Sequence, residues 1–156
     1  MAKVELTKEQ RLQLIIEAIN YCKKVKEMGM STSCYSKALR EPIFFLWENW
    51  GKGSKYKKSK FRSLASLGVE EGKNLLRYDH SIPFSIVQEQ LLSLNDVSLK
   101  TVEQILDSKL IACTITKEED ALLNKAGLNS KMPKNWDGVD PLARYREVNI
   151  KITENF

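Results

Sequence analysis

The only histidine in the sequence, His80, is the first residue whose type and neighbours could do chemistry. It follows Asp79 directly, and Pro83 comes three positions later. An imidazole ordinarily changes charge near neutral pH, so a histidine beside a carboxylate is a candidate general base. A hydrogen-bonded structural histidine is the alternative interpretation, and an isolated histidine does not separate the two.

The segments around His80 are predicted to form two strands and a helix. Residues 75–82, LLRYDHSI, are predicted to be a strand that ends at the following proline, because proline lacks an amide donor. Residues 110–115, LIACTI, are a second apolar run rich in β-formers. Thr116 and Glu119 have the spacing of a capping box, which predicts the start of a helix. Helical segments within 84–108 separate the two strands.

Residues 79–83, DHSIP, on a strand that is followed by a second strand and a helix, resemble the motif of the HNH endonuclease superfamily, the ββα-metal nucleases. The resemblance covers about residues 75–126. It implies a divergent member, because the helical insertion between the strands is much longer than the usual loop. It also implies that His80 is the general base that activates water and that Asp79 is a ligand of a divalent metal.

The same resemblance implies that the helix after the second strand supplies the remaining metal ligands. Asp120 and Asn124 are four residues apart and share one face of that helix. Their oxygen donors suit Mg²⁺ or Mn²⁺ better than zinc. Lys125 follows directly and is expected to touch the scissile phosphate. The alternative for this pair is an ordinary exposed helix face.

A basic run, KGSKYKKSKFR at residues 52–62, is the strongest charge feature of the chain. It contains no acidic residue, and the formal net charge of the protein is +5. We expect it to contact the phosphates of a nucleic acid, and a solvated basic loop is the alternative. The residues predicted to bind nucleic acid are Lys52, Lys55, Lys57, Lys58, Lys60, Arg62, Lys125 and Arg144.

The most hydrophobic part of the chain is residues 43–50, IFFLWENW. It is predicted to be a buried helix that starts near Pro42, because proline is common in the first turn of a helix, and a strand is the alternative for so short an apolar run. Its aromatic side chains are expected to belong to the core. If they were exposed instead, they would form an interface with a protein partner.

Length and composition favour one folded domain. The chain has 156 residues, 42% of them hydrophobic, with 7 Gly and 4 Pro, which excludes wholesale disorder. We expect a mostly helical α+β single domain, 1–156, around a small β-sheet. It would comprise a helical part with the basic loop (1–74), the ββα-metal-like motif with its helical insertion (75–126) and a C-terminal packing segment (127–156).

The start of the chain has no signal-peptide pattern, and no apolar run reaches the ~20 residues of a membrane span. Three cysteines without metal-type spacing favour free thiols and a cytoplasmic protein. The function expected from the sequence is therefore a metal-dependent nuclease that hydrolyses phosphodiester bonds, with DNA favoured over RNA. The alternatives are a non-catalytic nucleic-acid-binding module and a protein-interaction factor of the inhibitor or immunity type. A protein partner or a homodimer is also compatible with the sequence.

Overall fold

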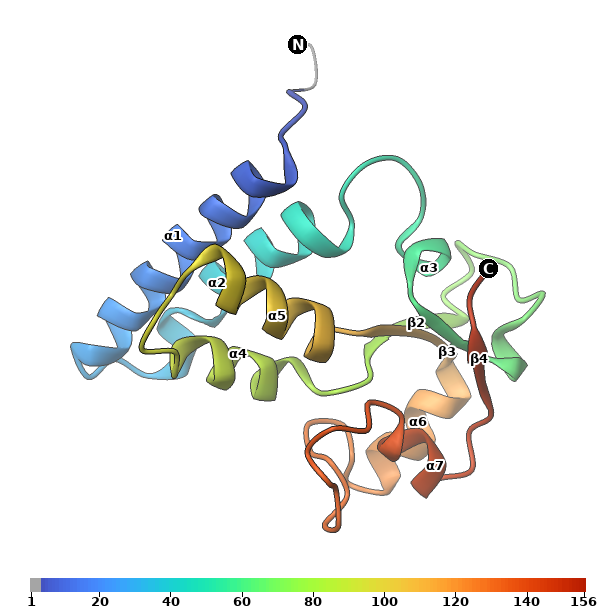
Figure 1. Ribbon diagram of the computed structural model, residues 1–156. Coiled ribbons are helices and arrows are strands. Elements are labelled where there is room, and N and C mark those ends of the chain that lie inside the picture. Colours follow the sequence, from blue (N-terminus) through green and yellow to red (C-terminus); the bar gives the residue numbers. More distant parts are fainter. Residues whose placement is uncertain (1–3) are drawn as a thin grey trace.

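A helical part and a small sheet lie side by side, and the chain returns from the sheet to the helical part between β2 and β3 (Figure 1). The computed structural model describes residues 4–156. Its α-helices are α1 (Lys8–Glu27), α2 (Ser36–Ile43), α3 (Lys55–Lys58), α4 (Phe84–Leu92), α5 (Leu99–Lys109), α6 (Lys117–Lys125) and α7 (Ala143–Glu147). The shorter helical turns are η1 (Thr32–Cys34), η2 (Phe44–Glu48), which is π-helical, and η3 (Leu64–Ser66). The strands are β1 (Phe61–Ser63), β2 (Leu76–His80), β3 (Ala112–Thr116) and β4 (Ile152–Glu154). The mostly helical α+β class predicted from the sequence is confirmed.

Helix α1 begins at a capping box between Thr7 and Gln10, in which each residue's side chain accepts a hydrogen bond from the other's backbone N–H. Its buried side chains recur at steps of three and four residues, and they are Leu12, Ile15, Ile16, Ile19 and Cys22. These residues join side chains of α2, α4 and α5 in the larger of two hydrophobic cores. Within residues 4–156, no helix combines the length and apolar character that a membrane span requires.

The sheet has four strands in the order β2-β3-β1-β4. Strand β3 is antiparallel to β2 and parallel to β1, and β4 closes the other edge antiparallel to β1. Every residue of β3 is buried, as the apolar run 110–115 predicts. The second core lies here, where β3 packs with α6, α7 and the C-terminal segment.

Strands β2 and β3 and helix α6 have the predicted β–β–α order, with α4 and α5 inserted between the strands. The predicted capping box starts α6: the Thr116 hydroxyl accepts from the Glu119 amide, and the Glu119 carboxylate accepts from the Thr116 amide. In the β2–β3 ladder, His80 pairs with Ala112 and Leu76 pairs with Thr116. His80 therefore lies at the start of β3, whereas α6 follows the opposite end of that strand.

The hydrophobic segment 43–50 differs from its prediction. Pro42 lies inside α2, so the helix begins well before it, at Ser36. Of the segment's side chains only Ile43 is buried in the core, and Phe45 is 61% exposed. The reason is that η2 lies at the edge of the larger core: Trp47 packs against this core half-buried, whereas Phe44 contacts Tyr78 of β2.

The three cysteines are free, and their environments predict unequal reactivity. Burial raises the pKa of the Cys22 thiol, and it raises the pKa of the Cys113 thiol to about 12. Because the thiolate is the reactive form, both should resist a disulfide reagent, whereas exposed Cys34 should react. We therefore expect Ellman's reagent to titrate one thiol in the native protein and three in guanidinium chloride. Fast reaction of all three in the native protein would contradict this packing.

Candidate functional site

His80 and Glu48 meet where the sheet adjoins the helical part. His80 is the last residue of β2 and Glu48 is the last residue of η2. Nε2 of His80 lies 2.6 Å from Oε1 of Glu48, and the two side chains are 18% and 4% exposed. A carboxylate only accepts hydrogen bonds, so Nε2 carries the proton in this contact. In the neutral imidazole, Nδ1 is then the nitrogen that can accept a proton.

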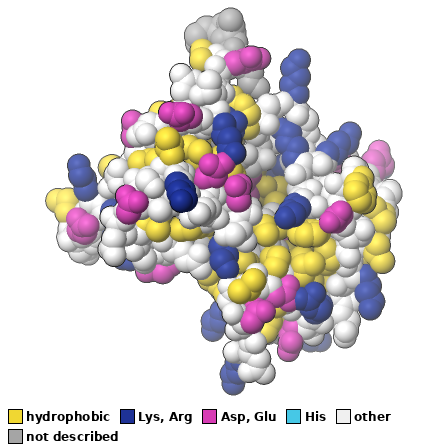
Figure 2. Space-filling view, viewed as in Figure 1, with side chains coloured by type: hydrophobic (Ala, Val, Ile, Leu, Met, Phe, Trp, Pro, Cys, Tyr) yellow, Lys and Arg dark blue, Asp and Glu magenta, His cyan; other side chains and the backbone are white. Residues whose placement is uncertain are grey.

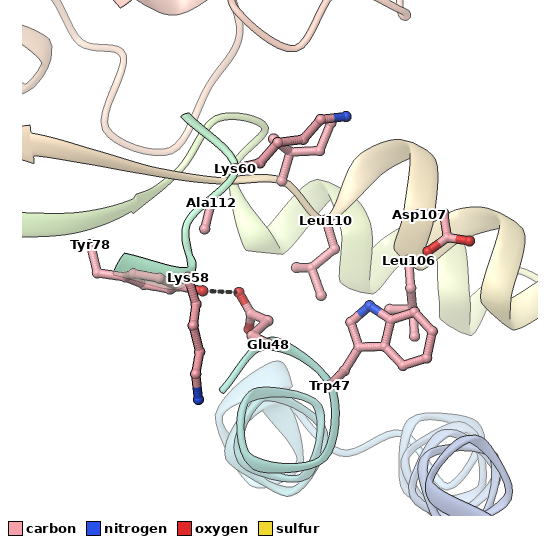
Figure 3. Close-up of a pocket in the computed structure, with 10 residues that line it drawn as sticks. Trp47, Glu48, Lys58, Lys60, Tyr78, Leu106, Asp107, Leu110 and Ala112 are labelled. Carbon is pink, nitrogen blue, oxygen red and sulfur yellow. Dashed lines mark hydrogen bonds between the residues drawn. The ribbon is translucent and has the colours of Figure 1, made fainter. Parts of the chain in front are cut away.

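Tyr78 binds the same oxygen of Glu48. Its hydroxyl donates to Oε1 at 2.9 Å, as the dashed line in Figure 3 shows. Burial raises the pKa of Tyr78 well above its ordinary value, and the negative charge of Glu48 raises it further. The phenol therefore stays protonated and continues to donate. The Glu48 carboxylate is thus held between two strand residues, Tyr78 and His80, on one side of β2.

The π-helical turn η2 brings Glu48 to this position. Pro42 lacks the N–H that an α-helix would use at that point. In the turn that follows Pro42, the Asn49 N–H donates to the carbonyl of Phe44, five residues earlier in the chain, at 2.8 Å. A turn that is one residue wider changes the direction of the side chains that follow it, and such turns are frequent at functional sites. The local sequence thus turns Glu48 towards β2.

A hollow of about 460 Å³ opens beside His80. Its lining is Arg40, Glu41, Phe44, Glu48, Lys55, Tyr78, His80 and Phe84. Nζ of Lys55 lies 5.5 Å from the centroid of the Tyr78 ring, and the Arg40 guanidinium lies 5.6 Å from that of Phe84. Two cationic side chains, Arg40 and Lys55, therefore line the hollow together with two acidic ones, Glu41 and Glu48. Glu48 is engaged with His80 and Tyr78, so Arg40 and Lys55 are the groups of this lining that suit a phosphate oxygen.

A second hollow, of about 170 Å³, shares Glu48 and Tyr78 with the first. Figure 3 shows the indole of Trp47 on the helical side of it, next to Leu106. The amine end of Lys60 points away from this hollow. The lining also includes charged residues, among them Lys58 and Asp107, so the hollow is polar with one aromatic wall. An exposed aromatic face is the kind of surface on which a nucleobase stacks.

The carboxylate of Asp79 is held by the C-terminal segment. Its Oδ2 accepts from Nη1 of Arg144 at 2.9 Å and from the Tyr145 hydroxyl at 2.6 Å. Arg144 is 1% exposed and also donates to the backbone carbonyls of Leu128 and His80. The prediction that Arg144 contacts phosphate does not fit this position, because its guanidinium is buried and engaged with internal acceptors. Arg144 instead ties α7 to the end of β2.

The three predicted metal ligands, Asp79, Asp120 and Asn124, have different environments. Asp79 already carries a buried cationic partner, which opposes a second cation at the same carboxylate. Asp120 is half-buried and Asn124 is exposed on α6, which follows the other end of β3. Within residues 4–156, no three His, Cys, Asp or Glu side chains are grouped so that they could hold one ion. The ion pair between Asp79 and Arg144 weighs against a shared Mg²⁺ or Mn²⁺ site, which stays a prediction.

The basic side chains predicted to bind nucleic acid have different environments. Lys58 donates to the backbone carbonyls of Trp50 and Gly51, and Arg62 donates to Ser66, so these two brace loops. Lys55 is half-buried at the hollow, and the exposed members are Lys52, Lys57, Lys60 and Lys125. On the face shown in Figure 2, Lys and Arg side chains are spread among acidic and apolar ones. Lys55 is thus the member of the basic run that lines the hollow beside His80.

Sequence reasoning missed Glu48, Tyr78 and Arg40. Glu48 did carry a signal, because it is the one acidic residue in the apolar run 43–50. A carboxylate in such a run is seldom buried without a partner, so a partner could have been sought. Nothing local identifies that partner as a histidine 32 positions later in the chain.

The chain matches no family model, and no curated protein or solved structure is found to be similar to it. The geometry around His80 is therefore the basis for a functional proposal.

Proposed function

We propose that the protein is a nuclease that cleaves the phosphodiester bonds of RNA, with His80 as the general base. The observation that carries this proposal is the 2.6 Å contact between His80 and the buried Glu48, in a hollow that Arg40 and Lys55 also line. A histidine oriented by a buried carboxylate is the arrangement that proton transfer in hydrolytic sites requires. We place this activity in the cytoplasm, where free thiols are the usual state of cysteines.

Proton abstraction at His80 is favoured by its contact with Glu48. The Glu48 carboxylate accepts a hydrogen bond from the N–H at Nε2 of His80. Nδ1 is then free to take a proton from the attacking hydroxyl. The imidazolium formed in this way carries its positive charge next to a carboxylate that is only 4% exposed. Oε2 of Glu48 has no hydrogen-bond partner within residues 4–156, and Oε1 accepts from Tyr78 and His80. The charged pair stabilises the product of proton transfer.

RNA is the substrate that this arrangement favours, which changes the preference for DNA drawn from the sequence. The 2′-hydroxyl of RNA is an internal nucleophile, so His80 can activate it without a metal-bound water. Its oxygen attacks the adjacent phosphorus while its proton passes to Nδ1. The bond from phosphorus to the 5′-oxygen breaks, and the leaving oxygen takes a proton from water. The products are a 2′,3′-cyclic phosphate and a 5′-hydroxyl.

The negative charge that builds up on the phosphate during this step requires cationic neighbours. Arg40 and Lys55 line the hollow and are placed to supply them. A guanidinium can bind two phosphate oxygens at once, whereas an ammonium acts as a point charge. The second hollow, with Trp47, lies next to the first and is suited to hold a base of the same strand.

The experiment that tests the proposal compares three oligonucleotides of one sequence: RNA, RNA with 2′-O-methyl groups, and DNA. Each is incubated with the protein in EDTA and, separately, in Mg²⁺. We expect cleavage of the unmodified RNA alone, with a 2′,3′-cyclic phosphate product and equal rates in both buffers. Cleavage of DNA that depends on Mg²⁺ would contradict this mechanism and favour the metal-dependent interpretation. Binding of all three without cleavage would contradict the enzyme and favour a nucleic-acid-binding module.

A further inference from the structure

Helix α1 has a second apolar face, in addition to the one that it buries in the core. Leu14 and Tyr21 on α1, and Met28 directly after its last residue, are 41%, 55% and 82% exposed, at intervals of seven residues. Ala18 and Val25 lie between them, and they are half-buried because they pack in part against the larger core. Figure 2 shows hydrophobic side chains exposed at the tip of the molecule where α1 ends in Figure 1. We call these five residues the α1 stripe.

The spacing of the α1 stripe is that of a two-helix coiled coil. Its positions follow one another at steps of four, three, four and three residues, which is the heptad pattern of alternating a and d positions. Helix α1 has 20 residues, so it is about 30 Å long. Ala18, near the middle, is small enough to let a second helix approach closely. The face is therefore built to pack against another helix of similar length.

We propose that the α1 stripe is the interface of a homodimer, in which α1 of a second copy packs against it in antiparallel orientation. A two-fold axis that passes between Ala18 and Tyr21 places Ala18 of one copy opposite Tyr21 of the other. It places Leu14 of one copy opposite Val25 of the other in the same way. Such an interface is self-complementary, as a two-fold contact must be.

Charges beside the α1 stripe support the second copy and its orientation. Glu17 and Lys24 are exposed and occupy the g positions that flank the stripe on one side. In an antiparallel pair g positions face g positions, so Glu17 of one copy lies near Lys24 of the other, twice across the axis. In a parallel pair each would face an e position, and those positions, Ile15 and Cys22, are buried in the protein's own core. Charge complementarity therefore favours the antiparallel dimer.

The first test is the molar mass of the protein in solution by sedimentation equilibrium. We expect twice the chain mass of 17.9 kDa for the wild type. A Tyr21→Lys variant should have the monomer mass, because it places a charge in the centre of the apolar contact. Leu122→Lys is the matched control, since Leu122 is an exposed apolar residue (47%) on helix α6, outside the α1 stripe. Leu122→Lys should remain dimeric.

The second test uses charge reversal, which alters the proposed contact without touching its apolar part. Glu17→Lys and Lys24→Glu should each weaken the dimer, because each places like charges opposite one another. The double variant should restore the dimer, since the pairs then form with exchanged signs. A monomeric wild type would overturn the proposal, and so would single and double variants that dissociate equally. Neither outcome affects the nuclease proposal, because the α1 stripe contains no residue of the hollow beside His80.

Discussion

A Glu48→Gln variant is expected to cleave RNA about 10²–10⁴-fold more slowly than the wild type. The amide has the same shape as the carboxylate, but it carries no charge to stabilise the imidazolium. Its NH₂ group can also donate to Nε2 of His80, which would select the tautomer whose proton lies on Nδ1. That imidazole cannot accept the proton of the 2′-hydroxyl.

The loss should appear in kcat, whereas KM should change little, because Glu48 acts through His80 and does not bind the substrate. Steady-state rates on a labelled RNA oligonucleotide measure both constants. Glu118→Gln is the matched control, since it makes the same chemical change at an exposed position of α6. Equal rates for Glu48→Gln and the wild type would show that the contact at 2.6 Å is only structural.

An Arg144→Met variant is expected to lose about 3–5 kcal/mol of unfolding free energy. Arg144 is 1% exposed, and its removal leaves the carboxylate of Asp79 without its cationic partner. Tyr145 continues to donate to Asp79, but a hydroxyl does not neutralise the charge. The backbone carbonyls of Leu128 and His80 also lose a donor. Urea denaturation followed by circular dichroism measures the change.

Arg146→Met is the control for this variant. Arg146 lies on the same helix, α7, and forms an ion pair with Asp140, but its side chain is 62% exposed. Exposed pairs contribute at most about 1 kcal/mol, so this variant should remain close to the wild type. If Arg144→Met were no less stable than Arg146→Met, the buried contact between α7 and β2 would not exist in solution.

Features that depend on residues close in sequence could be predicted. The capping box of α6 was predicted from two residues three positions apart, and it is formed. The apolar run 110–115 indicated a buried strand for the same reason, since the apolar side chains of the segment itself predict its burial. The helical insertion between β2 and β3 followed from the patterns of α4 and α5.

The candidate site could be predicted only in part, because its contacts join distant parts of the chain. His80 was identified from its type and its place at a strand end. Glu48 was not, because a π-helical turn after Pro42 decides where its side chain points. The partner of Asp79 was also missed, since Arg144 lies 65 residues later and its burial depends on how α7 packs against the sheet. Because arginine side chains are usually exposed, the sequence indicated a surface position for Arg144.

The most direct test of the central claim is the cleavage of RNA in EDTA by the wild type beside a His80→Ala variant. Circular dichroism spectra and urea midpoints of the two proteins first establish that both are folded. The account predicts that the wild type cleaves and that the variant's rate falls at least about 10²-fold, with RNA binding retained. Cleavage by the folded variant at the wild-type rate would contradict a catalytic role for His80.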